Sequence, residues 1–240
     1  MTAIKGPLGI IVIIIFLLIF LHLIFNPTLS VTYLYMVVGV IGAVLLDKYV
    51  LKTTTMFPIE REGTMESRVV AVLWAGAIYG IMSLGLGWLT QNYLSTSQSV
   101  IQLLSTNMPL LQDNLILSIL SYGIMIPFLE TYLINVIGLE LGLQFADSAV
   151  GNTIPKRDFW ANFTNWRIWM VVLLFAGIFI MYHIQIRGLD PSATVPLVIT
   201  GIFSIISSWM VIGFREGIQA ILLHNMTNII ATLALVKTLS

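Results

Sequence analysis

Three ionisable side chains in the middle of apolar runs carry the chemistry that this sequence suggests. Glu130 lies in PFLETYLIN, His183 in FAGIFIMYHIQ and His224 in ILLHNMTNII. An ionisable group inside a bilayer costs about 2.5–3.5 kcal/mol even on a lenient insertion scale, so its retention indicates a partner or a function. We therefore expect the three side chains to share one polar site inside the membrane.

Polar neighbours at helical spacing would complete such a site. Asn228 follows His224 by four residues, so the two side chains share one face of a helix. Pro127 precedes Glu130 and removes a backbone hydrogen bond, which frees carbonyl groups to line a polar cavity. The further polar side chains close to Glu130 in the sequence are Thr131 and Asn135.

A carboxylate, two imidazoles and a carboxamide in a low-dielectric pocket are suited to hydrolysis. The glutamate could take a proton from water while a histidine orients that water or shuttles the proton. Histidine and asparagine donors could stabilise the oxyanion of the transition state. Alternatively, Glu130, His183 and His224 could bind a divalent metal such as zinc through two nitrogen atoms and one oxygen atom. The residues alone leave both alternatives open.

The composition defines the elements that must position these groups. The chain has 240 residues, of which 58% are hydrophobic and only 9% charged, whereas soluble domains carry about 25% charged residues. Together with several apolar stretches close to membrane-spanning length, this predicts an all-α, polytopic transmembrane bundle. The net charge of zero gives no indication of nucleic acid as a partner. The absence of cysteine excludes disulfides and thiolate metal sites.

Seven apolar segments predict seven transmembrane helices. They are Leu8–Phe25, Val31–Leu46, Val69–Leu89, Leu115–Val136, Met170–Gln185, Val195–Phe214 and Ile218–Val236. Residues 92–114 alternate in polarity and predict an interfacial amphipathic helix. Glu140 and Asp147, after the fourth segment, are expected in a solvated loop or at the interface.

The basic residues of the predicted loops are divided unequally between the two sides of the membrane. The side of the N-terminus would carry Lys5, Lys48, Lys52, Arg61, Arg68, Lys156, Arg157, Arg167 and Arg215, and the other side Arg187 and Lys237. The positive-inside rule then places the N-terminus in the cytoplasm. Aromatic residues every three positions before the fifth segment predict a belt at the cytoplasmic interface, made of Trp160, Phe163, Trp166 and Trp169.

Depth along the predicted helices separates the two histidines. If the fifth segment begins near Met170, His183 lies ~20 Å from the cytoplasmic face, whereas His224 lies only ~9 Å from it. Helix tilt, or a lower start of the fifth segment, would have to bring the two histidines together.

Three short motifs occur in order on three of the predicted helices. Phe179–His183 (FIMYH) matches FxxxH, His224–Asn228 (HNMTN) matches HxxxN, and Glu130 opens a glutamate motif before both. Over roughly residues 116–230 the chain resembles the intramembrane proteases of the CAAX-processing and bacteriocin-processing family, also called CPBP or Abi. The stretch FREGIQAILLHNMTN is especially similar to the final motif of that family.

The resemblance implies a single membrane domain, with residues 1–113 as variable N-terminal spans and residues 114–240 as a protease-like core. Glu130 would activate water with help from His183, and His224 and Asn228 would form the oxyanion pocket, supported by Thr131, Asn135 and Phe179. The substrate would be a membrane-anchored peptide or protein. The resemblance leaves open whether a metal is required. The host membrane would be a prokaryotic-type plasma membrane or an organelle membrane derived from one.

The first motif departs from the EExxxR pattern of that family. Thr131 stands in place of the second glutamate and Asn135 in place of the arginine. Both replacements are neutral, so no charge is left without a partner. The departure keeps a second interpretation open: a non-catalytic relative that serves as a scaffold, an assembly factor or a subunit of a larger membrane complex. A third interpretation is that His183 or His224 ligates a pigment, a haem or a metal.

Overall fold

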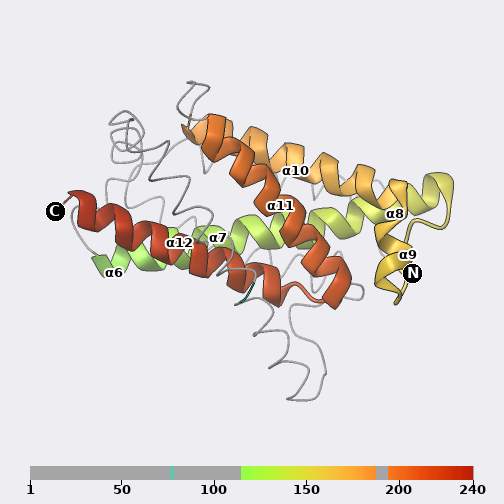
Figure 1. Cartoon of the computed structure of the whole chain (residues 1–240), viewed down its shortest axis with the longest axis horizontal. Coiled ribbons are helices and arrows are strands. Elements are labelled where there is room, and N and C mark those ends of the chain that lie inside the picture. The colour runs from blue at the N-terminus through green and yellow to red at the C-terminus, as the bar shows by residue number, and fades with distance from the viewer. Residues whose placement is uncertain (1–76, 78–114, 188–193, 240) are drawn as a thin grey trace, which may run out of the picture.

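The computed structural model describes residues 77, 115–187 and 194–239. The first two predicted transmembrane segments and the amphipathic stretch 92–114 lie outside the described residues, as does the third segment apart from Ala77. The described part is helical and contains no strand, which confirms the predicted all-α class for these residues. Its helices form an elongated bundle (Figure 1).

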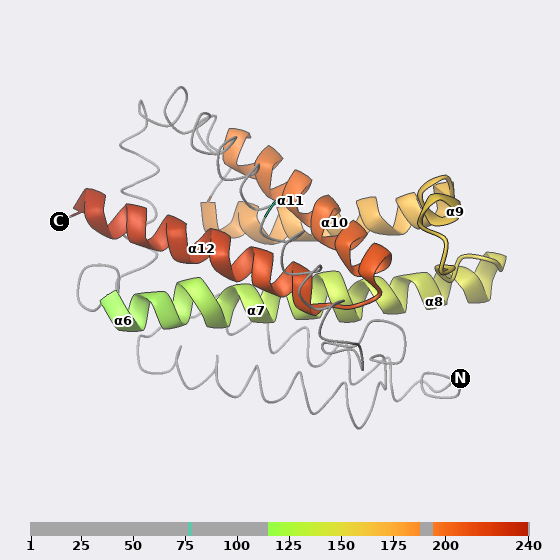
Figure 2. The ribbon, with the colours of Figure 1, turned by 60° about the horizontal axis from the view of Figure 1, so that its bottom comes forward.

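The first described helix is a long, nearly straight rod whose internal geometry changes along its length (Figure 2). It comprises α6 (Leu115–Ser118), the π-helical segment η4 (Ile119–Met125), α7 (Ile126–Glu130), the π-helical segment η5 (Thr131–Gly138) and α8 (Leu139–Val150). Pro127 lies at the junction of η4 and α7, inside the continuous rod, and has no N–H to donate to the preceding turn. The wide π-helical turns adjoin Glu130, the last residue of α7. Such turns are frequent at functional sites.

The remaining helices pack around this rod. They are α9 (Phe159–Phe163), α10 (Trp166–Arg187), α11 (Thr194–Phe214) and α12 (Ile218–Leu239). In the views of Figures 1 and 2, α12 runs along η4 and α7 while α11 crosses α10. In the described part of the chain, three helical stretches are long and apolar enough to cross a membrane: Tyr122–Val150, Trp166–Ile184 and Leu197–Phe214. These lengths are compatible with an integral membrane protein.

The helix that carries Glu130 continues beyond the predicted end at Val136. Leu139 and Leu143 are fully buried and extend the core-facing stripe into α8. Glu140 was expected in a solvated loop or at the interface; it lies between these leucines in α8 and is 0% exposed, so the solvated loop is wrong. The side chain of Gln144 donates to Glu140 Oε1 at 3.0 Å, one turn further along the same helix.

The turn between α11 and α12 lies well inside the bundle rather than at its end. Gly217 packs directly on Val136, because a Cβ at this glycine would come within 2.7 Å of Val136 Cγ2. The rod continues from Val136 to Val150, about 20 Å further. Depth counted from the start of α12 therefore underestimates how far inside the bundle His224 lies, and this explains how both histidines reach the same carboxyl group.

The connection between α8 and α10, residues 151–165, folds back over this recessed turn. Arg215 donates from Nη1 to the carbonyl oxygen of Pro155 at 2.9 Å. The Phe159 ring contacts Trp209 edge-on, with centroids 5.9 Å apart. The four predicted belt residues do not share one helix face, because α9 ends at Phe163 and a new helix starts at Trp166.

Candidate active site

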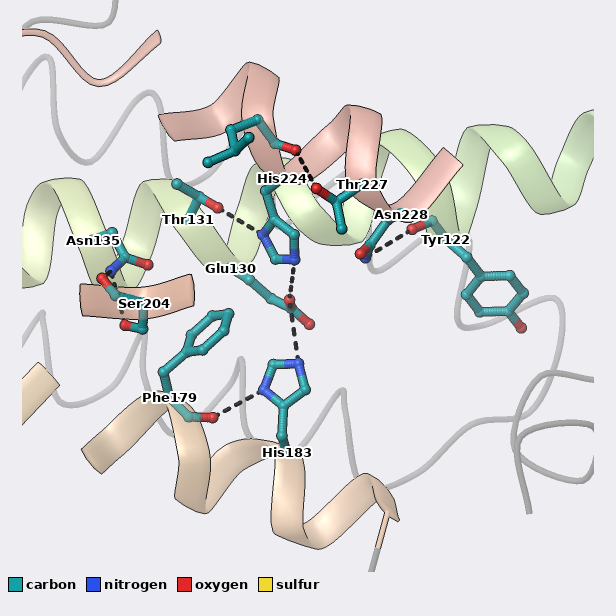
Figure 3. A network of polar contacts seen from close by, with 11 residues as sticks. Tyr122, Glu130, Thr131, Asn135, Phe179, His183, Ser204, His224, Thr227 and Asn228 are labelled. Atoms are coloured by element: carbon teal, nitrogen blue, oxygen red, sulfur yellow. Dashed lines mark hydrogen bonds and ion pairs between the residues drawn. The ribbon is translucent and has the colours of Figure 1, made fainter. Parts of the chain in front are cut away.

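Glu130 lies where three separate helices meet. Its Oε2 atom is 3.7 Å from Nε2 of His224 on α12 and 4.0 Å from Nε2 of His183 on α10 (Figure 3). All three residues are buried, with exposed fractions of 3% for Glu130, 4% for His224 and 8% for His183. The structure thus brings together three residues that span almost a hundred positions of the sequence.

The FxxxH spacing determines which ring nitrogen of His183 carries a hydrogen. Its Nδ1 lies 2.9 Å from the carbonyl oxygen of Phe179, four residues earlier on α10. A carbonyl only accepts hydrogen bonds, so Nδ1 carries the hydrogen. In the neutral ring Nε2 is then an acceptor, and it faces Glu130. The Phe179 ring lies 4.5 Å from the His183 ring and 5.8 Å from the His224 ring, centroid to centroid, and so touches both imidazoles.

The Nδ1 atom of His224 pairs with a hydroxyl group, which can either donate or accept a hydrogen bond. Among the described residues, the Thr131 hydroxyl pairs with His224: Thr131 Oγ1 lies 2.8 Å from His224 Nδ1. When the hydroxyl donates to Nδ1, the ring hydrogen is on Nε2, which faces Glu130. The ring of Phe203 lies 4.6 Å from the His224 ring, centroid to centroid, and restricts its rotation. With the hydroxyl as donor, one acceptor imidazole and one donor imidazole flank the same carboxyl group.

Asn228 lies one turn further along α12 than His224 (Figure 3). Its Nδ2 donates to the carbonyl oxygen of Tyr122, on η4, at 3.3 Å. This bond uses one of the two amide hydrogens of Asn228. This hydrogen bond ties α12 to η4, one turn from His224.

Asn135 contacts α11 instead of the carboxyl group. Its Nδ2 donates to the backbone oxygen of Ser204 at 3.1 Å and to the hydroxyls of Ser204 and Ser208 at 3.0 Å each. Sequence reasoning missed these serines, although Thr200, Ser204 and Ser208 recur every four residues in an otherwise apolar helix. Since Phe203 adjoins Ser204 and contacts His224, Asn135 also helps to hold the helix that carries this ring.

The carboxyl and imidazole groups do not fit a metal centre. No three His, Asp or Glu side chains of residues 115–187 and 194–239 are arranged to hold one ion. Ligands of a tetrahedral zinc lie about 3.3 Å from each other, closer than the 3.7 and 4.0 Å found here. Both Nδ1 atoms are hydrogen-bonded, so each histidine would have to bind a haem or a pigment through the Nε2 atom that faces Glu130.

Comparison with protein-family models, with curated proteins and with solved structures finds no match for this chain. The interpretation of the site therefore depends on its own chemistry: a buried carboxyl group between the Nε2 atoms of two histidines.

Proposed function

We propose that the protein is an intramembrane peptidase of the CAAX/bacteriocin-processing type, which hydrolyses a peptide bond of a membrane-bound substrate. The observation that carries the proposal is the position of Glu130 Oε2 between Nε2 of His183 and Nε2 of His224. The first nitrogen is an acceptor in the neutral ring, and the second is a donor when the Thr131 hydroxyl donates to Nδ1. Three helices contribute one group each, in the chain order of the motifs Glu130, FxxxH and HxxxN.

The acceptor pair provides a place for the attacking water. Glu130 Oε2 and His183 Nε2 are 4.0 Å apart, and a water about 2.8 Å from each atom could donate one hydrogen to each. Glu130 then takes a proton as the water oxygen forms a bond to the substrate carbonyl carbon. That proton passes to the leaving nitrogen as the C–N bond breaks, which yields a new carboxyl terminus and a new amine.

The donor groups face the oxygen that becomes negative during this attack. His224 presents its Nε2 hydrogen when the Thr131 hydroxyl donates to Nδ1. Asn228 retains a second amide hydrogen beyond the one bonded to Tyr122. Preorganised donors of this kind typically contribute 10²–10³-fold each to the rate.

A non-catalytic scaffold, assembly factor or subunit of a larger membrane complex is the alternative. The observation in its favour is that Thr131, Asn135 and Asn228 all bond to neighbouring helices. Polar contacts between membrane helices stabilise the bundle by about 0.6 kcal/mol each and require no chemistry. On this alternative the two histidines also have only a structural role.

Hydrolysis is tested directly by isotope transfer. The protein is reconstituted in liposomes with pools of prenylated peptides, leader peptides and membrane-anchored proteins, in water enriched in ¹⁸O. We expect cleaved products whose new carboxyl terminus contains one ¹⁸O atom, and we expect none with the His183→Gln variant. A folded wild-type protein that cleaves no member of the pools supports the scaffold alternative instead.

Thr131 offers a test of the donor role of His224. Thr131→Val is expected to lower kcat by about tenfold to a hundredfold, because an unpaired buried group costs about 1–3 kcal/mol and each 1.36 kcal/mol is a factor of ten. Thr227→Val is the matched control, since that hydroxyl bonds only within α12, to Leu223 O. Nitrogen NMR of ¹⁵N-histidine should show loss of the Nε2–H form of His224 in Thr131→Val alone. An unchanged tautomer would refute this assignment.

The proposal includes seven transmembrane helices, a cytoplasmic N-terminus and a site that opens to the cytoplasm. The host membrane would be a prokaryotic-type plasma membrane or an organelle membrane derived from one, and the partners would be lipid and a membrane-anchored substrate. The unequal distribution of basic residues supports this orientation. A reporter inserted at Arg157 should face the cytoplasm and one fused after Ser240 the opposite side. Reporters on the same side would contradict it.

A further inference from the structure

A continuous row of buried polar side chains runs from the candidate active site along the rod. Thr131, Asn135 and Glu140 are each 0% exposed, and Gln144 follows one turn beyond, partly buried. Their spacings of four, five and four residues match the wide turns of η5 and the normal turns of α8, so the four side chains share one face. Buried polar groups of this number are unusual in an apolar bundle.

The facing helix α11 presents a second polar row. Thr200, Ser204, Ser207 and Ser208 fall within about 100° of its circumference, and none is more than 7% exposed. Asn135 connects the two rows, because its Nδ2 bonds to Ser204 and Ser208. The Thr131–His224 hydrogen bond lies one turn of η5 from this connection (Figure 3).

Hydrogen-bonding capacity remains unused along these rows. Asn135 Oδ1 and Ser207 Oγ are buried and have no protein partner among the described residues. Gln219 Oε1, in the first turn of α12 close to where Gly217 packs on Val136, is in the same state. Leaving such an atom unpaired costs about 1–3 kcal/mol, and ordered water is the usual partner of buried polar atoms.

We propose that these rows bind a file of water molecules that leads from Glu130 toward the α8 end of the bundle, beneath residues 151–165. The inference rests on the proposed function for its purpose, since hydrolysis consumes one water per bond and the bilayer core supplies none. Asn135 Oδ1, Ser207 Oγ and Gln219 Oε1 accept hydrogen bonds from these waters. The departure from the EExxxR motif thereby gains a role: an asparagine offers water an acceptor that an arginine lacks.

The absence of cysteine from the chain makes the water file testable by thiol accessibility. Ser207→Cys and Ser208→Cys change one oxygen to sulfur at two buried positions of the row. Ala220→Cys is the matched control, because Ala220 is equally buried but belongs to the apolar core. Each folded variant is exposed to silver ion, which travels with water, then unfolded, and its remaining free thiol is counted with a maleimide.

We expect silver to react with the thiol of Ser207→Cys, and so block its later labelling by maleimide, at a rate at least tenfold higher than with the thiol of Ala220→Cys. Ser208→Cys provides the same comparison if the first variant does not fold, as judged by size-exclusion elution and thermal unfolding. Equal rates at the row and at the control position would overturn the water file. The measurement needs no peptidase activity. A protein that reacts rapidly with silver but cleaves no substrate would support the water file and contradict only the proposed hydrolysis.

Discussion

Replacing Glu130 with glutamine is expected to lower hydrolysis by about 10²–10⁴-fold, the usual contribution of a general base, while leaving the fold intact. Glutamine has the same shape but cannot take the proton of the attacking water. Glu130 Oε2 lies 3.7 and 4.0 Å from the two histidine nitrogens, beyond the distance of direct hydrogen bonds, so glutamine breaks no hydrogen bond between these atoms. Initial rates on a cleaved substrate, with thermal unfolding of the same preparations, provide the measurement.

The melting temperature separates catalysis from a structural role. Because a buried charge is costly, Glu130→Gln should unfold at or above the temperature of the wild type. A residue that served only to hold α10 and α12 together would instead lower the melting temperature when changed. Gln144→Leu is the control for polar loss elsewhere on the rod, where Gln144 donates to Glu140. A variant that melts early and cleaves normally would contradict the assignment of Glu130 as base.

The residues of the candidate active site could be predicted because each violates a local rule. Glu130, His183 and His224 are ionisable groups in apolar runs, and the membrane penalises each enough to imply a partner. The FxxxH spacing also has a local cause, since residue 179 is the one whose carbonyl lies beside the His183 ring on a helix. These signals depend only on residue type and separation along one helix.

Other features depend on how helices cross, which no single helix encodes. The recessed start of α12 follows from the contact of Gly217 with Val136, across eighty residues of sequence. Because of this recessed start, a depth estimated by counting residues along each helix separately is misleading. Glu140 was expected in a solvated loop or at the interface, yet the helix continues through Leu139 and Leu143 and Glu140 is buried beside them. The hydrogen bonds of Asn135 to α11 likewise could not be predicted from a single helix, because they depend on how the two helices pack.

Asn135→Arg is expected to destabilise the protein by about 3–5 kcal/mol, the cost of an uncompensated buried charge. Asn135 is 0% exposed and bonded to two serine hydroxyls, none of which neutralises a guanidinium. Adding Thr131→Glu, four residues earlier on η5, supplies a carboxylate one turn away and recreates the EExxxR pattern. The double variant should therefore be more stable than Asn135→Arg alone, by about 1–3 kcal/mol of coupling.

The coupling is measured as a double-mutant cycle of unfolding free energies in mixed detergent micelles. Thr131→Gln with Asn135→Met forms the matched neutral cycle, because these side chains have similar length and no charge, and it should show little coupling. Strong coupling confined to the charged pair would mean that the geometry of η5 still accommodates the Glu–Arg pair of the proteases that this chain resembles. Additive costs in both cycles would mean that positions 131 and 135 never form such a pair here, and the resemblance would lose its structural basis at the first motif.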